Sequence, residues 1–240
     1  MADPKKPISP QSGVVTFLDV LGWKGVYDRQ SNAIKKLTDL IEGLENHAKT
    51  ERGGPFAAQI KSISDTIAIF SFCEEMKASG AIEMHGRLCQ WVIPESITSE
   101  IPVRGATSYG EFEISSNGNI FVGKAVDEAA SWHEQSDWIG VHLTPSAEYI
   151  FKPEIATSAW RTYCPPNKTR LSWKPHCVNW VSDINNPQKM VDIKTKFRCL
   201  GPIVPEIAGK FANTLQFIDT ISPQTVEPSL VGEEEAGSGI

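Results

Sequence analysis

The sequence lacks long apolar runs, paired cysteine motifs and basic stripes. No apolar run reaches the roughly 18–20 residues needed to cross a bilayer, so we expect no membrane partner. The 240 residues carry a formal net charge of −6 without a clustered basic stripe, which disfavours nucleic acid as a partner. No internal repeat is present either. A composition of 40% hydrophobic and 22% charged residues therefore indicates a globular protein with one substantial core.

The few cysteines indicate free thiols. The five cysteines are odd in number and form no Cys-x-x-Cys pair, which is typical of a reducing compartment. A zinc site on Cys164, His176 and Cys177 would lack a fourth ligand. Residues 1–11 contain no apolar segment of the kind that a secretion signal carries. We therefore expect a cytoplasmic protein.

Alternating strand and helix patterns run through residues 13–143. The predicted strands are 13–19, 56–63, 66–72, 103–114 and 138–143, and the predicted helices are 31–48, 76–93 and 124–134. Pro94 is expected to end the second helix. The Ser116-Asn117-Gly118-Asn119 segment predicts a hairpin that returns as strand 120–122.

This element order predicts an α+β fold, a ferredoxin-like βαββαβ sheet with helices on one face. Residues 13–221 would form one catalytic domain, with C-terminal additions from about residue 147. These additions are an irregular stretch at 160–181 and a helix at 205–221. We expect a flexible tail over 1–12 and a disordered acidic tail over 222–240.

Two aspartates are the first candidates for chemistry. Asp19 follows an apolar strand, and Asp65 lies at the turn between two strands. Two carboxylates on neighbouring strand ends can hold two divalent cations roughly 3.5–4 Å apart, an arrangement that drives phosphoryl transfer. Each aspartate alone is also a common turn residue, so the prediction of a cation site depends on Asp19 and Asp65 occurring together.

Four motifs in order resemble the class III nucleotidyl cyclases over residues 13–146. Residues 17–23 (FLDVLGW) are similar to the first metal-binding motif, and residues 61–65 (KSISD) to the second, which usually has Gly before the Asp. Residues 104–110 (RGATSYG) look like the Arg-containing strand. Gly123, Val126, Ala129 and Ala130 match the start of the family's third helix.

The resemblance implies roles for these residues. Asp19, Asp65 and the backbone at Val20 would bind two Mn²⁺ or Mg²⁺ ions, which carboxylate oxygens favour. Arg104 would contact the terminal phosphates, for which a planar guanidinium is suited. Two further sets of substrate contacts are implied. The backbone of Leu21, Gly22 and Trp23 would bind phosphate at a helix start. Lys61 and Ile120 occupy the base-reading positions.

Departures from the family pattern indicate an unusual base. Lys61 keeps the usual lysine, but Ile120 replaces the expected acid, so the purine-reading pair is incomplete. The usual Asn and Arg of the third helix align with Asp127 and Ser131. Since that Arg stabilises transition-state charge, Lys124 or another basic residue would have to replace it, and Asp127 is a further candidate.

The chain most resembles the pyrimidine cyclases of the bacterial Pycsar antiphage system. That resemblance implies conversion of UTP to 3′,5′-cyclic UMP and pyrophosphate, and a diffusible product that acts on a separate effector. It also implies a head-to-tail homodimer with sites at the interface. Alternatives are a cytidylate cyclase, an adenylyl cyclase, a cyclase-like protein that binds nucleotide with weak or no catalysis, and a ferredoxin-like interaction domain.

Overall fold

The computed structural model describes residues 11–23, 26, 31–51, 57–115, 118, 120–153, 158–169, 172–182, 184, 187–199 and 205–221. The strands of this part form one eight-stranded sheet in the order β2-β3-β1-β4-β6-β8-β7, with β5 paired to β4. The strands are β1 (Gln11–Val20), β2 (Gln59–Ile63), β3 (Thr66–Phe72), β4 (Val103–Ile114), β5 (Phe121–Val122), β6 (Val141–Leu143), β7 (Trp160–Thr162) and β8 (His176–Val178).

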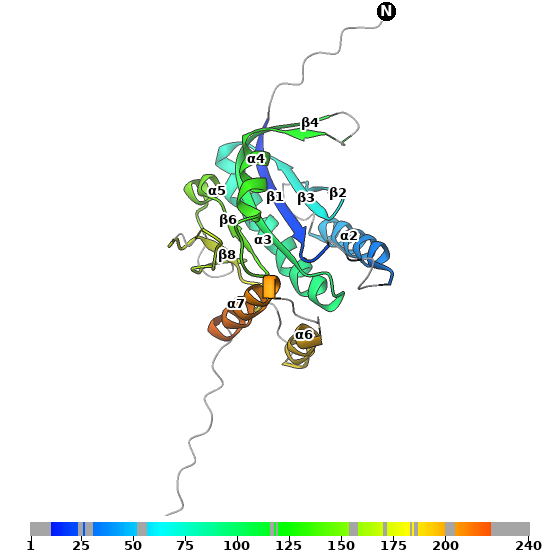
Figure 1. Cartoon of the computed structure of the whole chain (residues 1–240). Coiled ribbons are helices and arrows are strands. Elements are labelled where there is room, and N and C mark those ends of the chain that lie inside the picture. The colour runs from blue at the N-terminus through cyan, green and yellow to red at the C-terminus, as the bar shows by residue number, and fades with distance from the viewer. Residues whose placement is uncertain are drawn as a thin grey trace, which may run out of the picture.

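The first four sheet positions have the predicted ferredoxin-like arrangement. Strands β2, β3, β1 and β4 pair antiparallel throughout, and the connections run through α2 (Ala33–Thr50) and α3 (Glu75–Thr98). Both helices cover one face (Figure 1), where Leu37, Leu44 and Leu88 pack against Val14 and Leu18 of β1. The α+β fold class is confirmed.

Helix α4 (Lys124–His133) covers part of the opposite face. The alternate β1 residues Val15 and Phe17 pack there against Ala125 and Ala129. Because successive side chains of a strand point to opposite faces, Asp19 follows Val15 and Phe17 onto the α4 face. This alternation places the candidate site on the face that α2 and α3 leave uncovered.

The C-terminal additions extend the sheet. Strands β7 and β8 pair antiparallel within the stretch 160–181 and continue the sheet beyond β6. Helices α5 (Pro145–Ile150), α6 (Pro187–Cys199) and α7 (Pro205–Ile221) complete the fold, and α7 lies below β6 and β8 in Figure 1. Its Phe217 packs on Trp138, Tyr163 and Trp180 at ring-centroid distances of 4.7, 4.9 and 5.9 Å.

Two sequence predictions of boundaries are wrong. Helix α3 continues through Pro94 to Thr98, because Ile93 and Ile97 on either side of the proline are fully buried. That packing offsets the roughly 3 kcal/mol cost of a proline inside a helix. Strand β6 begins at Val141 and not at Trp138, since the Ile139 amide bonds to the Thr214 hydroxyl at 2.8 Å instead of joining the ladder.

Some predictions fall outside the described residues. These are residues 1–10 of the predicted tail 1–12, the tail over 222–240, and the hairpin residues Ser116, Asn117 and Asn119. The last two residues of the predicted N-terminal tail, Gln11 and Ser12, belong to β1, where they pair with β4. None of the described helices is long and apolar enough to span a membrane. The cysteines with described side chains, Cys73, Cys89, Cys164 and Cys177, are free thiols.

A buried polar chain ties α3 to the sheet. The Thr16 hydroxyl lies 2.8 Å from Nδ1 of His85 and 2.7 Å from the Thr107 hydroxyl. Nε2 of His85 lies 3.0 Å from the Ser71 hydroxyl. Both ring nitrogens are therefore partnered, and His85 is completely buried.

This buried histidine predicts an acid-sensitive core. Burial lowers the pKa of His85 to about 3 and that of His142 to about 4, whereas an unfolded histidine has a pKa of about 6.5. Below that value the unfolded chain binds protons that the folded chain does not, so stability falls as pH falls from about 6.5 towards 4. We expect each histidine to cost about 2 kcal/mol of unfolding free energy at about pH 5.

Urea denaturation at about pH 7.5 and about pH 5 measures this effect. The His85→Gln variant isolates one histidine from the carboxylates that also titrate in acid. It should lose about 2 kcal/mol less than the wild type between the two pH values. An equal pH dependence in the two proteins would contradict the assignment of His85 as a neutral core group.

Candidate functional site

The centre of the candidate site is an ion pair between Asp19 and Arg104. The two residues are directly opposite in the β1–β4 register, and both lie on the α4 face of the sheet. Nε and Nη2 of Arg104 donate to Oδ2 of Asp19 at 3.1 and 3.0 Å. Their side chains are only 11% and 19% exposed, so water screens the pair weakly.

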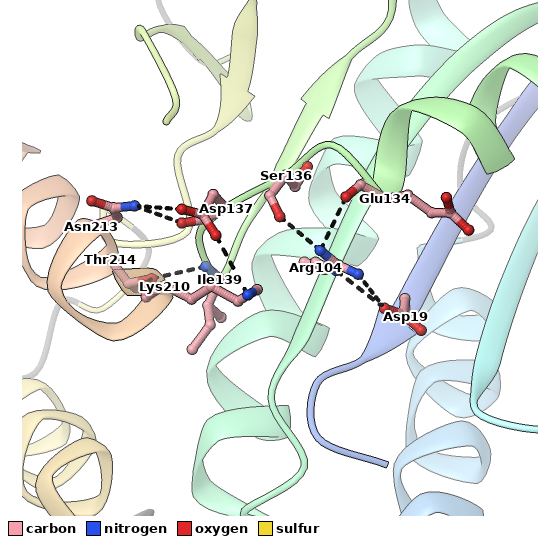
Figure 2. A network of polar contacts seen from close by, with 9 residues as sticks. All are labelled: Asp19, Arg104, Glu134, Ser136, Asp137, Ile139, Lys210, Asn213 and Thr214. Atoms are coloured by element: carbon pink, nitrogen blue, oxygen red, sulfur yellow. Dashed lines mark hydrogen bonds and ion pairs between the residues drawn. The ribbon is translucent and has the colours of Figure 1, made fainter. Parts of the chain in front are cut away.

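The other end of the Arg104 guanidinium is held by backbone. Nη1 donates to the carbonyl oxygen of Ser136 at 2.8 Å and to that of Glu134 at 3.3 Å. Both carbonyls belong to the segment that follows α4, and Figure 2 shows Arg104 between this segment and Asp19. Arg104 is thus fixed along both edges.

Asp65 lies at the neighbouring strand end. It follows Ser64, which adopts the left-handed conformation (φ 56°) at the β2–β3 turn, and its carbonyl accepts a 3.1 Å hydrogen bond from the Val20 amide. Within the described residues, the Asp65 carboxylate makes no hydrogen bond or ion pair. The β1–β3 pairing therefore brings Asp65 beside Val20, one residue along from Asp19.

These donors suit a hard divalent cation. The Asp19 and Asp65 carboxylates and the Val20 carbonyl are oxygen ligands of the kind that Mg²⁺ and Mn²⁺ prefer. In the part of the chain that the structure describes, no three His, Cys, Asp or Glu residues form a ready metal cluster. A cation at Asp19 would have to compete with Arg104 for the same carboxylate.

The turn after β1 has two occupied amides. The Val20 amide donates to Asp65, and the Leu21 amide donates to the Pro102 carbonyl at 2.8 Å. Gly22 permits the turn through its positive φ of 76°, and Trp23 packs partly buried against the core. The Leu21 amide, one of the predicted phosphate contacts, is therefore already engaged in a hydrogen bond.

The structure brings Lys61 to the hairpin that carries Ile120. Lys61 is on the edge strand β2, two strands from β1 and on the same face as Asp19. A Cβ atom on Gly118, in the β4–β5 hairpin, would lie 2.9 Å from both Cε and Nζ of Lys61. Ile120 closes that hairpin through hydrogen bonds with Ser115 and is 63% exposed.

Lys124 and Asp127 are remote from Arg104 in the same chain. Lys124 forms an exposed 3.3 Å ion pair with Glu111, which lies seven positions along β4 from Arg104. Asp127 is in the first turn of α4, and its carbonyl accepts the Ser131 hydroxyl at 2.8 Å. Neither side chain joins the Asp19–Arg104 centre within one protomer.

Sequence reasoning missed the residues that surround Arg104. Glu134 and Ser136 act through backbone carbonyls, which no side-chain motif signals. Lys168 was also missed. Partial burial and the nearby positive charges of Arg104 and Lys210 lower the pKa of Lys168. Its amide donates to the Gln135 carbonyl at 3.0 Å, which places this segment of the additions beside the site.

Comparisons with known proteins agree with this geometry at the level of fold. No protein-family model matches the sequence, and no curated protein matches it. Among solved structures, the catalytic core of a rhodopsin-guanylyl cyclase with converted specificity, in complex with ATPαS, matches with a TM-score of 0.50. The match has 16% identity and covers 71% of this chain and 96% of that chain. The chain has the fold of a nucleotidyl cyclase catalytic core.

Two further cyclases align less closely. The adenylyl cyclase CyaB from P. aeruginosa matches at 15% identity, covering 70% of this chain and 93% of that chain with a TM-score of 0.46. The guanylyl cyclase Cya2 matches at 11% identity, with 71% and 91% coverage and a TM-score of 0.46.

Proposed function

We propose that this protein is a nucleotidyl cyclase that converts UTP to 3′,5′-cyclic UMP and pyrophosphate. One observation carries the proposal: two carboxylates, Asp19 and Asp65, lie on adjacent strand ends of a cyclase fold, and Arg104 pairs with Asp19. The carboxylates have the chemistry to hold divalent cations, and the guanidinium has the chemistry to bind a triphosphate.

The chain's own residues would share the chemistry as follows. Asp19, Asp65 and the Val20 carbonyl would hold the two ions, which when bound supply activation of the ribose 3′-oxygen and stabilisation of the triphosphate charge. The Asp19 carboxylate would bind a cation in place of Arg104. Arg104, still held through Nη1 by the Ser136 carbonyl, would then direct Nε and Nη2 towards phosphate oxygens.

Lys61 and Ile120 support a pyrimidine substrate. Lys61 has only donors, so it suits the O4 carbonyl of uracil and not the amino group of cytosine. Ile120 cannot accept the hydrogen bond that an acidic residue would take from a purine amino group. A cytidylate cyclase is the alternative with the same mechanism.

The assembly and cellular role belong to the same proposal. One chain carries one cyclase unit, so a head-to-tail homodimer would form two equivalent sites. Asp19 and Asp65 would come from one chain, and Lys61 and α4 from the other. The cyclic nucleotide would act on a separate effector in antiphage defence, as the resemblance to the Pycsar cyclases implies.

A competition assay tests the substrate. Purified protein is incubated with equal concentrations of UTP, CTP, ATP and GTP in Mn²⁺, and the products are identified by mass spectrometry. We expect cyclic UMP to be the main product. Lys61→Ala should lower the preference for UTP over CTP at least about tenfold, because the loss of a specific buried hydrogen bond removes discrimination. Lys35→Ala, an exposed lysine of α2 that pairs with Asp39, is the control.

Two outcomes would contradict parts of the proposal. Faster turnover of CTP or ATP than of UTP would reject uridylate specificity while leaving a cyclase. No cyclic product from any nucleotide would reject the activity.

A nucleotide-binding protein with little catalysis is the second candidate. The observation that favours it is the substitution of Asp127 and Ser131 for the family's Asn and Arg, together with the hydrogen bond that ties the Ser131 hydroxyl within its own helix. Saturable UTP binding without product would support this candidate over the first.

A further inference from the structure

Helix α7 contacts the segment that holds Arg104. The Thr214 hydroxyl accepts the Ile139 amide at 2.8 Å, and Asn213 donates to the Asp137 carbonyl at 2.7 Å. Lys210 lies 3.4 Å from the Asp137 carboxylate. Residues spaced by three and four lie on one helical face, so this face of α7 is directed at residues 137–139 (Figure 2).

The segment is also fixed from other sides. The Asp137 amide donates to the Pro166 carbonyl at 3.1 Å, and the Ser136 hydroxyl lies 3.2 Å from Nδ1 of the buried His142. Helix α7 itself is anchored by Phe217, which packs among three aromatic rings. The C-terminal additions thus determine where residues 134–139 lie.

A continuous set of contacts therefore joins α7 to Asp19. Thr214 and Asn213 form hydrogen bonds with residues 137–139. The carbonyls of Glu134 and Ser136 in the same segment accept hydrogen bonds from Nη1 of Arg104. Nη2 of Arg104 in turn donates to Asp19. We propose that α7 is a positioning element for Asp19: by fixing residues 134–139 it holds Arg104 on Asp19, and loosening α7 makes Asp19 more available to a divalent cation. The cation step of this inference rests on the proposed function.

The direction of the effect follows from competition for one oxygen. Oδ2 of Asp19 accepts both hydrogen bonds from Arg104. A cation that binds this carboxylate must displace the guanidinium. The free-energy cost of that displacement increases with the strength of the hydrogen bonds that fix Arg104 in place. If the segment loses an anchor, Nη1 loses fixed acceptors and the Asp19–Arg104 pair weakens. Thr214, Asn213 and Lys210 are positioning residues in this scheme, because none of them touches Asp19.

Thr214→Val is the decisive variant. It preserves the shape of a fully buried side chain and removes the acceptor of the Ile139 amide. Thr220→Val is the matched control, since Thr220 on the same helix also donates to a carbonyl one turn earlier but is exposed to solvent. Thr214→Ser retains the hydroxyl and should behave as the wild type.

Two measurements that do not depend on catalytic turnover distinguish these variants. The first is hydrogen exchange of the Arg104 Nε–H by NMR, with the signal assigned by its loss in Arg104→Lys. The second is the dissociation constant for Mn²⁺ without nucleotide, from the EPR signal of free Mn²⁺. In Thr214→Val we expect exchange about threefold to tenfold faster and Mn²⁺ binding tighter by a similar factor, the size of one hydrogen bond.

The outcomes separate this inference from the proposed function. Equal exchange or equal Mn²⁺ affinity in Thr214→Val and Thr220→Val would overturn the inference, even for a protein that makes cyclic UMP. A wild-type protein that makes no cyclic nucleotide, but whose Arg104 exchange and Mn²⁺ affinity change as expected, would overturn the proposed function alone.

Discussion

Asp65→Ala is expected to lower the rate of cyclic nucleotide formation by more than about 10³-fold. The variant removes one of the two carboxylates that would hold the cations, and several kcal/mol of transition-state stabilisation correspond to about three powers of ten in rate. The fold should persist, because the hydrogen bond from the Val20 amide goes to the Asp65 backbone and survives the substitution. We expect the unfolding free energy to change by less than about 1 kcal/mol.

Product formation by mass spectrometry and urea denaturation together check this result. Asp65→Asn keeps the shape of the side chain and removes its charge, so it should be nearly as inactive as Asp65→Ala. Asp39→Ala removes an exposed carboxylate of α2 that pairs with neighbouring Lys35 and should retain full activity. An Asp65→Ala protein that retains wild-type activity would reject the two-cation mechanism.

The sheet was predictable because strand alternation and helix periodicity both agreed with the buried faces. Val14, Val15, Phe17 and Leu18 place apolar side chains on both sides of β1, as expected for a strand covered by α2 and α3 on one face and by α4 on the other. Local sequence signals gave wrong element boundaries where contacts between residues distant in the sequence determine the structure. Pro94 remains helical because its neighbours are buried, and Ile139 leaves the ladder because α7 offers a hydroxyl.

The candidate site was predictable in its acidic residues and not in their partners. Asp19 and Asp65 were expected together because antiparallel neighbours bring a strand end and a turn to the same edge, and the Val20–Asp65 hydrogen bond is consistent with this. The pairing of Arg104 with Asp19 depends on the β1–β4 register, which the spacing of motifs does not determine. The carbonyls of Glu134 and Ser136 carry no side-chain signal, so only the structure reveals how Arg104 is held.

The contacts of α7 are a further feature of the structure that the sequence does not predict. Thr214 and Asn213 are ordinary polar residues of an amphipathic helix, and nothing in their spacing indicates a link to Asp19. Their role emerges only from the fold, which places the last helix against the segment after α4. The additions beyond residue 147 are therefore part of the surroundings of the candidate site and not a separate appendage.

Mixing an inactive Asp65→Ala chain with a Lys61→Ala chain is expected to restore sites that prefer UTP. In the proposed head-to-tail dimer, Asp65 serves the site in which its own chain supplies the cation ligands, whereas Lys61 serves the opposite site. A heterodimer of Asp65→Ala and Lys61→Ala chains then has one doubly altered site and one intact site. Statistical exchange of subunits should make roughly a quarter of all sites intact, so the mixture should regain a preference for UTP over CTP that Lys61→Ala alone has lost.

The matched control mixes Asp19→Ala with Asp65→Ala. Both residues lie at the same end of one chain, so every site in that heterodimer lacks one cation ligand and no activity should return. Lys61 lies two strands away, beside the β4–β5 hairpin, and this separation on the sheet permits a different chain to use it. Rescue in the control mixture, or no return of the UTP preference in the Lys61 mixture although Lys61→Ala alone has lost it, would show that the ligands are not divided between chains in this way.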